Sequence, residues 1–233
     1  MRQALATLGE APGSGAFHGA IRTAYALSTG SDAEVAHALA YWAAAFESLG
    51  DVQALRGTAT PFEALTESGP AGARPPGRNI AERMQAVRRT PACESLVARV
   101  DPAKLSLDAL AQAALQAYAA TGDFTLLHAV TGTQAARVLA AHAPDPQRFL
   151  VQCWRAMAAA YLSCGAPPLG DDAFAKPCAA TWPAILERAC AAQDEHDIKC
   201  AHACWLEFRR TGDDRYRRAA AARLAMADVE AAC

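Results

Sequence analysis

The sequence predicts an all-α protein, an antiparallel helical bundle or array, from three observations. Alanine dominates the 233-residue chain, together with Leu, Arg, Gln and Glu, which are strong helix formers. Few segments alternate between polar and apolar residues, and β-branched residues do not cluster. Hydrophobic residues make up 52% of the chain, enough for a sizeable core. We therefore expect a single helical domain over residues 1–233.

Helical periodicity and boundary signals give the individual helices in chain order. Ser31 and Ser106 precede two of them, and their hydroxyl oxygens can cap free backbone N–H groups. At Gly122-Asp123 and Gly212-Asp213, a glycine suited to left-handed backbone precedes a capping Asp, which predicts tight joints between antiparallel helices. The ten expected helices are 15–28, 33–49, 80–89, 92–100, 105–120, 123–141, 146–163, 182–192, 195–210 and 213–231.

Two segments are expected to be loops. Residues 67–78 contain Pro75-Pro76 and three glycines, which are incompatible with a regular helix, so we expect a flexible loop there. A second loop spans residues 164–172. The first is long enough either to separate two subdomains or to form a lid over a cleft.

Charge and hydropathy exclude several classes of partner. The net charge is −2 and no basic stripe is present, so a nucleic-acid partner is not expected. The apolar runs are too short to span a bilayer, and the N-terminus lacks the apolar core of a signal peptide. We therefore expect a cytoplasmic protein without a membrane partner.

The eight cysteines give no sign of a disulfide framework or a structural zinc site. No C-x-x-C pair occurs, and Cys200 and Cys204 lie one helical turn apart without a second pair to complete a zinc set. In a chain without an export signal, buried cysteines of this kind act as small apolar residues.

Two segments, 123–132 and 194–202, contain His128, His196 and Lys199, and both fall in Ala/Leu-rich stretches that predict buried helix. Burying histidine, lysine and carboxylate side chains is unfavourable unless something pairs with them, and a metal ion is the simplest such partner. His18, between Phe17 and Gly19, has the same character.

Each of these residues also has an ordinary structural interpretation. A lone histidine such as His128 is more often a hydrogen-bonded core residue, while Thr131 and Gly132 one turn on could bond to it or make room for a ligand. His196 and Lys199 are three residues apart and share a helix face, whereas His202 is rotated away from His196. Asp194 and Glu195 are sufficiently explained by a capped helix start.

Four segments around these residues resemble the questin oxidase-like family. They occur in the order and the all-helical context of that family, and the resemblance covers nearly the whole chain. Each motif is short, so the specificity comes from finding them together. The segments are 16–25, 36–42, 123–132 and 194–199.

The resemblance implies an oxidoreductase that uses O₂ to open a ring of a small-molecule aromatic substrate such as an anthraquinone. It also implies a non-haem iron, with His18, His128 and His196 as nitrogen ligands and a carboxylated lysine at Lys199. A desolvated lysine has a lowered pKa, and its neutral amine can add CO₂ to form an anionic oxygen ligand.

The expected catalytic residues are His128, His196 and Lys199. The candidates for lining an apolar substrate cleft are Tyr25, Tyr41, Trp42 and Phe124.

Two other functions stay open. The same fold could use NADPH and O₂ without a metal, in Baeyer–Villiger fashion, although the chain lacks a Gly-rich dinucleotide fingerprint. It could also be a non-catalytic helical module that binds a ligand or a partner.

The resemblance further implies an N-terminal helical segment with another histidine, whereas only residues 1–15 precede the first matching segment here. Either this sequence begins late or the chain is a shortened member of the family. In a shortened member, we expect that water, His37 or His202 replaces the missing ligand, or that no metal binds. On its own sequence pattern, His37 is expected to line the core or a cavity. Missing helices would also expose an apolar face, which favours a homodimer.

Overall fold

The computed structural model describes residues 1–50, 55–69, 72–170, 173–174 and 178–226. These residues form twelve α-helices and no strand, which confirms the all-α prediction. The helices are α1 (Arg2–Leu8), α2 (His18–Thr29), α3 (Asp32–Ala44), α4 (Pro61–Thr66), α5 (Ile80–Val87), α6 (Pro91–Ala98), α7 (Leu107–Thr121), α8 (Phe124–Ala140), α9 (Pro146–Ser163), α10 (Trp182–Cys190), α11 (Glu195–Thr211) and α12 (Arg215–Arg223).

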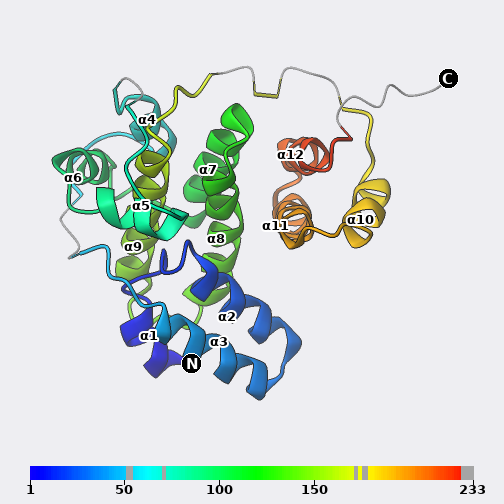
Figure 1. Cartoon of the computed structure of the whole chain (residues 1–233), viewed down its shortest axis with the longest axis horizontal. Coiled ribbons are helices and arrows are strands. Elements are labelled where there is room, and N and C mark those ends of the chain that lie inside the picture. The colour runs from blue at the N-terminus through cyan, green and yellow to red at the C-terminus, as the bar shows by residue number, and fades with distance from the viewer. Residues whose placement is uncertain (51–54, 70–71, 171–172, 175–177, 227–233) are drawn as a thin grey trace.

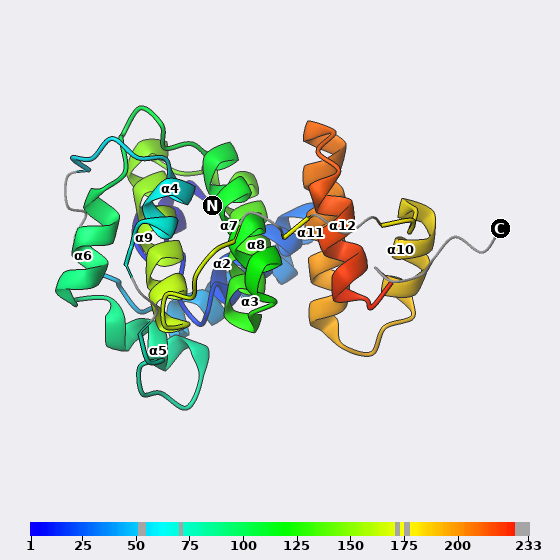
Figure 2. The same cartoon turned by 90° about the horizontal axis from the view of Figure 1, so that it is seen from above.

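Helix α8 is the central helix of the fold. It packs against α2, α7, α9 and α11, and 13 of its 17 residues are buried. In Figure 1, α4, α5, α6 and α9 lie on one side of α8, α10 to α12 lie on the other, and α1 to α3 lie below. Figure 2 shows α10, α11 and α12 as a separate group on the far side of α8 from α5 and α6.

The predicted joints form as the sequence indicates. Gly122 and Gly212 adopt left-handed backbone, with φ of +63° and +71°. Asp123 accepts a hydrogen bond from the Thr125 N–H at 2.7 Å, and Asp213 accepts one from the Arg215 N–H at 3.0 Å. The helices that these joints connect, α7 with α8 and α11 with α12, pack against each other.

The predicted serine caps are also confirmed. The Ser31 and Ser106 hydroxyl oxygens accept hydrogen bonds from the backbone N–H groups of Glu34 and Ala109, at 3.3 and 3.1 Å. Each serine therefore satisfies a donor that the first helical turn leaves without a partner.

Two helices and several boundaries differ from the prediction. Helices α1 and α4, which have only seven and six residues, were not among the expected helices. Helix α4 begins with a capping box, in which Thr60 and Glu63 bond to each other's backbone N–H, and this T-x-x-E pattern could have identified it. Helix α3 ends at Ala44 rather than at residue 49. The end of the predicted range 213–231 lies outside the described residues.

The two predicted loops lie against each other. The Gly72 N–H donates to the Gly165 carbonyl oxygen at 2.7 Å, and Arg74 forms an ion pair with Asp123. This second contact attaches the first loop to the start of α8. Residues 70–71 and 171–172 of these loops lie outside the described residues.

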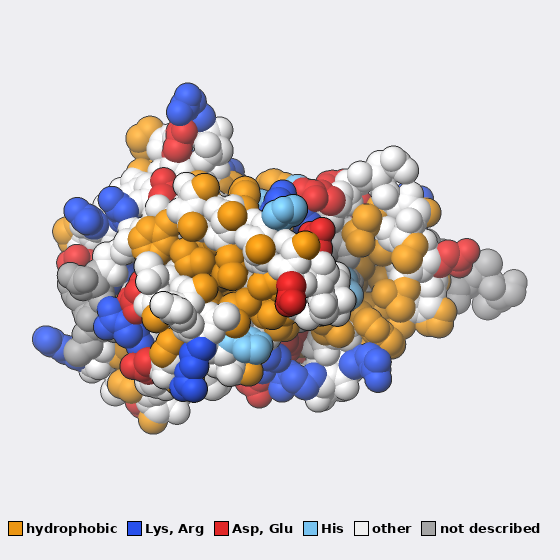
Figure 3. Space-filling model, turned by 90° about the horizontal axis from the view of Figure 1, so that it is seen from below, with side chains coloured by type: hydrophobic (Ala, Val, Ile, Leu, Met, Phe, Trp, Pro, Cys, Tyr) orange, Lys and Arg blue, Asp and Glu red, His pale blue; other side chains and the backbone are white. Residues whose placement is uncertain are grey.

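Hydrophobic side chains cover much of the face that Figure 3 shows from below, the side on which α1 to α3 lie in Figure 1. No helix in the described part of the chain has the length and hydrophobicity needed to cross a lipid bilayer.

Candidate metal centre

Three histidines from three helices converge beside α8. His18 begins α2, His128 lies in α8, and His196 lies in the first turn of α11. One ring nitrogen from each lies within 4.8 Å of the others, and this is the one such group of potential metal ligands found among the described residues. The ring centroids of His128 lie 4.9 Å from His18 and 5.1 Å from His196, while His18 and His196 are 6.2 Å apart.

A left-handed turn directs His18 toward α8. Gly15, Ala16 and Phe17 have φ of +57°, +57° and +69°, so α2 starts at His18 and not at residue 15 as predicted. For Ala and Phe this backbone costs about 1–3 kcal/mol each, and it persists only where the surroundings enforce it. Phe17 is buried, which fixes the turn in place.

Gly132 makes the room that Phe17 needs. A Cβ atom on Gly132 would lie 2.6 Å from Phe17 Cδ1, far closer than any real contact. Gly132 could have made room for a ligand, but in the structure the ring of Phe17 lies against it. Thr131 donates to the carbonyl oxygens of Leu127 and His128 within its own helix.

The Nδ1 atom of each histidine in the cluster has an oxygen acceptor. His18 Nδ1 lies 2.7 Å from the Gly15 carbonyl oxygen, and His128 Nδ1 lies 2.8 Å from the Phe124 carbonyl oxygen. His196 Nδ1 lies 2.8 Å from a carboxylate oxygen, Asp194 Oδ1. An acceptor at Nδ1 places the proton there, so each Nε2 keeps its lone pair. This is the arrangement in which imidazole coordinates a metal and an outer partner fixes its orientation.

Burial keeps two of the rings neutral. Desolvation is the main cause that lowers the pKa of His18 and lowers the pKa of His128 to about 4. The neighbouring Lys199 and His196 act in the same direction, and the hydrogen bonds to backbone carbonyls act against it. At neutral pH these imidazoles are therefore uncharged, which is the form that binds a metal.

Lys199 lies beside the cluster with its charge already paired. Its Nζ lies 2.9 Å from Glu195 Oε2, one turn earlier on α11, and its side chain is 20% exposed. The sequence interpretation of this segment as buried helix is therefore only partly correct. Cys200 is fully buried, but Ile198 is 42% exposed and Glu195 faces solvent.

Of the four aromatic candidates, Phe124 contacts the cluster. Its ring centroid lies 4.8 Å from that of His128 and 4.7 Å from that of His196, and it is 44% exposed. Phe124 therefore covers two of the three imidazoles on the solvent side.

The structure places the other three aromatic residues in different surroundings. Tyr25 packs on His202 with ring centroids 5.5 Å apart, and burial raises the pKa of Tyr25 to about 12. Tyr41 lies under the Arg22 guanidinium. Trp42 is fully buried against Gly19, and its Nε1–H donates to the Ala11 carbonyl oxygen, so it belongs to the core.

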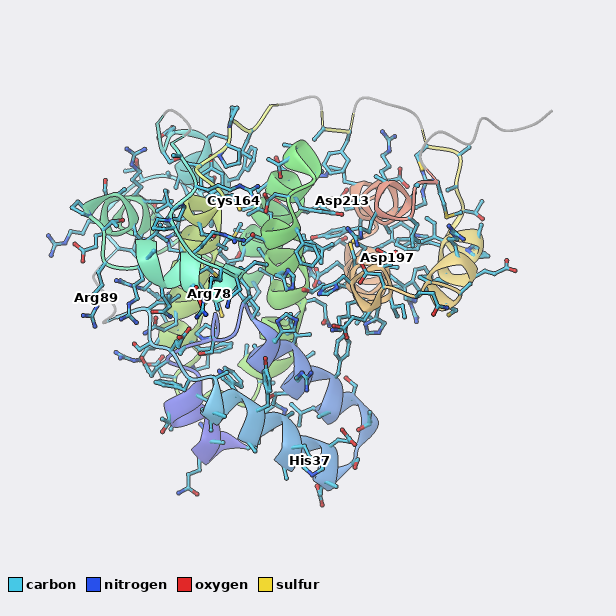
Figure 4. All side chains as sticks on the ribbon, viewed as in Figure 1. His37, Arg78, Arg89, Cys164, Asp197 and Asp213 are labelled. Atoms are coloured by element: carbon cyan, nitrogen blue, oxygen red, sulfur yellow. The ribbon has the colours of Figure 1, made fainter. Side chains whose placement is uncertain are left out.

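The two substitute ligands considered from the sequence lie outside the cluster. His37 is exposed on α3, so the expectation that it lines the core or a cavity is wrong (Figure 4). His202 is half-buried beside Tyr25, and its Nδ1 has no hydrogen-bond partner among the described residues. The cysteines of the described segments are free, and none joins the histidine group.

Asp194 has a function that sequence reasoning missed. We attributed it to helix capping, and it does accept the His196 backbone N–H at 2.9 Å. It also accepts the His196 ring N–H. The spacing Asp194-x-His196, with an acidic residue two positions before a candidate ligand at a helix start, is the signal that could have indicated this second function.

Comparison with known proteins identifies the family of the chain. The model of the questin oxidase-like family matches residues 12–204, a segment that contains His18, His128, His196 and Lys199. Searches of curated proteins and of solved structures give no match. Because the matched segment covers most of the 233 residues, the chain belongs to the questin oxidase-like family, which indicates an oxidoreductase.

Proposed function

We propose that the protein is a metal-dependent oxygenase that acts with O₂ on an aromatic or quinone substrate. In this proposal His18, His128 and His196 hold a non-haem iron. The observation that carries it is the convergence of three imidazoles whose Nδ1 atoms are all bound to acceptor oxygens.

The donor set fits iron. Imidazole nitrogen is a common ligand for iron, and three protein ligands leave coordination positions open. A bound iron would supply a redox centre with room for O₂ and substrate. Since the three ligands come from separate helices, their positions depend on the tertiary fold rather than on one flexible segment.

Lys199 is proposed as a fourth, anionic ligand after carboxylation. Its neutral amine would attack the carbon of CO₂, forming the N–C bond of a carbamate and releasing a proton. The ion pair with Glu195 favours the charged ammonium and so opposes this step. Carboxylation therefore requires that pair to break and the ammonium first to lose a proton to solvent, which also takes up the proton released when the carbamate forms.

Phe124 is proposed to receive the substrate. Its exposed ring lies against two of the histidines and offers an apolar surface on which a planar aromatic molecule can stack. A substrate stacked there would also displace water from the solvent side of the cluster.

The test is oxygen consumption by Fe(II)-reconstituted protein with a panel of hydroxylated quinones. Turnover that His196→Ala abolishes supports the proposal. Turnover by metal-stripped protein with NADPH would replace it with the metal-free oxidase. Quinone binding without turnover, in a protein that takes up no metal, would indicate the non-catalytic module.

A further inference from the structure

An arginine from α12 holds the start of α11. Arg223 Nη2 lies 2.8 Å from Asp194 Oδ2, and Arg223 Nε lies 2.5 Å from Asp197 Oδ1. Asp194 is the N-cap of α11, and Asp197 lies in its first turn. Figure 4 shows Asp197 on α11 near α12. The guanidinium of Arg223 therefore binds two carboxylates at the N-terminal start of α11, the helix that carries His196.

The two oxygens of Asp194 connect Arg223 to the imidazole of His196. Oδ2 accepts from Arg223, while Oδ1 accepts both the backbone N–H and the ring Nδ1–H of His196. A carboxylate held from both sides cannot rotate freely. The orientation and protonation pattern of the His196 ring are therefore coupled to the position of Arg223.

Arg223 is well enclosed for a charged side chain. It is 23% exposed, and Asp197 is 22% exposed. Its charge also acts on Tyr118, a buried residue of α7. Charge-assisted hydrogen bonds in such a setting are stronger and less screened than those of a fully solvated ion pair.

We propose that Arg223 is a positioning residue for the histidine cluster, acting through Asp194 to keep His196 in the Nδ1–H tautomer with Nε2 available to a metal. The consequence for metal affinity rests on the proposed function, whereas the effect on the tautomer does not. Arg223 lies outside the matched residues 12–204, so α12 adds a support to the site that the family match does not include.

The direct test is the tautomer of His196 in metal-free protein. Long-range ¹H–¹⁵N correlation spectra at pH 8 report which ring nitrogen carries the proton. We expect Nδ1–H in the wild type and a shift toward Nε2–H in Arg223→Met, which keeps an unbranched apolar side chain. Titration with Co(II) should then give a dissociation constant about tenfold higher in Arg223→Met, as is common when an outer partner is lost.

Arg217→Met is the matched control. Arg217 also lies on α12, is 18% exposed and pairs with a carboxylate, but its partner is Asp214 and not Asp194. It should leave both the tautomer and the Co(II) affinity unchanged. An unchanged tautomer in Arg223→Met, or an equal change in Arg217→Met, would overturn the proposal.

Two further variants keep the proposal testable if Arg223→Met folds poorly. Arg223→Lys keeps the charge but loses the two-pronged geometry, so an intermediate shift is expected. In an Asp194→Asn background, Arg223→Lys should add little to the tautomer shift, because the connection between Arg223 and His196 is already weakened, and additive effects of the two substitutions would contradict the proposal. If the wild type binds no Co(II), the proposed function fails, and the tautomer comparison still decides the role of Arg223.

Discussion

The two sides of the histidine cluster are held by different forces. His128 is 2% exposed in the central helix α8, and its ring is bound to a backbone carbonyl of that same helix. The His196 side chain is 19% exposed at the start of α11, where Asp194, itself paired with Arg223, holds it. Packing therefore fixes the inner side and charge fixes the outer side. We therefore expect substitutions that change side-chain volume, and a fall in pH, to disturb the side of His128. Substitutions that change charge should disturb the side of His196.

The largest expected effect is the acid sensitivity of the inner side. The pKa of His128 is about 4 in the folded chain, against an ordinary value of about 6.5. Between these values the unfolded state binds the proton and the folded state does not, so stability falls as pH drops. We expect a loss of about 3 kcal/mol in the free energy of unfolding between pH 7 and pH 4, relative to a chain without this group.

Urea denaturation of metal-free protein at several pH values measures this loss. His128→Leu should make the free energy of unfolding less dependent on pH. The control His37→Gln, at an exposed residue, should keep the pH dependence of the wild type. Since carboxylates also titrate in this range, the difference between the variants is the informative quantity. If the free energy of unfolding changes equally with pH in the wild type and in His128→Leu, the buried, neutral state of His128 would be contradicted.

A methyl group at Gly132 should disturb the inner side through volume alone. In the middle of a helix, Gly→Ala normally stabilises by about 1 kcal/mol. Here the added Cβ would overlap Phe17, so we expect a net destabilisation of about 1–2 kcal/mol, together with weaker metal binding. The measurement is thermal or urea denaturation alongside Gly170→Ala, where an added Cβ has no neighbour within 4 Å. A higher free energy of unfolding in Gly132→Ala than in the wild type would contradict this expectation, because Phe17 would then be able to move at no cost in stability.

Most helices could be predicted from the sequence, because caps and helical spacing are local signals. The three histidines of the cluster were singled out from short motifs that resemble a known family, and their role as ligands stays a prediction. The turn at 15–17 could not be predicted, since left-handed Ala and Phe oppose local preference. The turn depends on the burial of Phe17 and on the space that distant Gly132 leaves for it. Arg223 is 29 residues from Asp194 along the chain, and no spacing rule connects them. His37 was misjudged because its apolar neighbours are not all buried: Ala36, Ala40 and Tyr41 face solvent together with it.

The smallest effect on stability is expected on the outer side, at Glu195. Glu195→Gln breaks an exposed pair and should cost about 0.5 kcal/mol. It should nevertheless raise the fraction of carboxylated Lys199, because the ammonium loses its partner. The carbamate signal in ¹³C NMR with labelled bicarbonate measures this fraction.

Glu82→Gln is the control for this experiment, since it removes another exposed pair one helical turn apart, with Arg78. It should leave the carbamate signal unchanged. A carbamate signal that does not rise in Glu195→Gln would argue against Lys199 as a modified ligand and would leave the three-histidine set as it stands.

The most direct test of the histidine cluster as one metal centre is the metal content of purified protein after reconstitution with Fe(II) and bicarbonate. Elemental mass spectrometry should find stoichiometric iron in the wild type and in His37→Ala, and a loss in each of His18→Ala, His128→Ala and His196→Ala. Iron retained in all three cluster variants, or absent from the wild type, would contradict it.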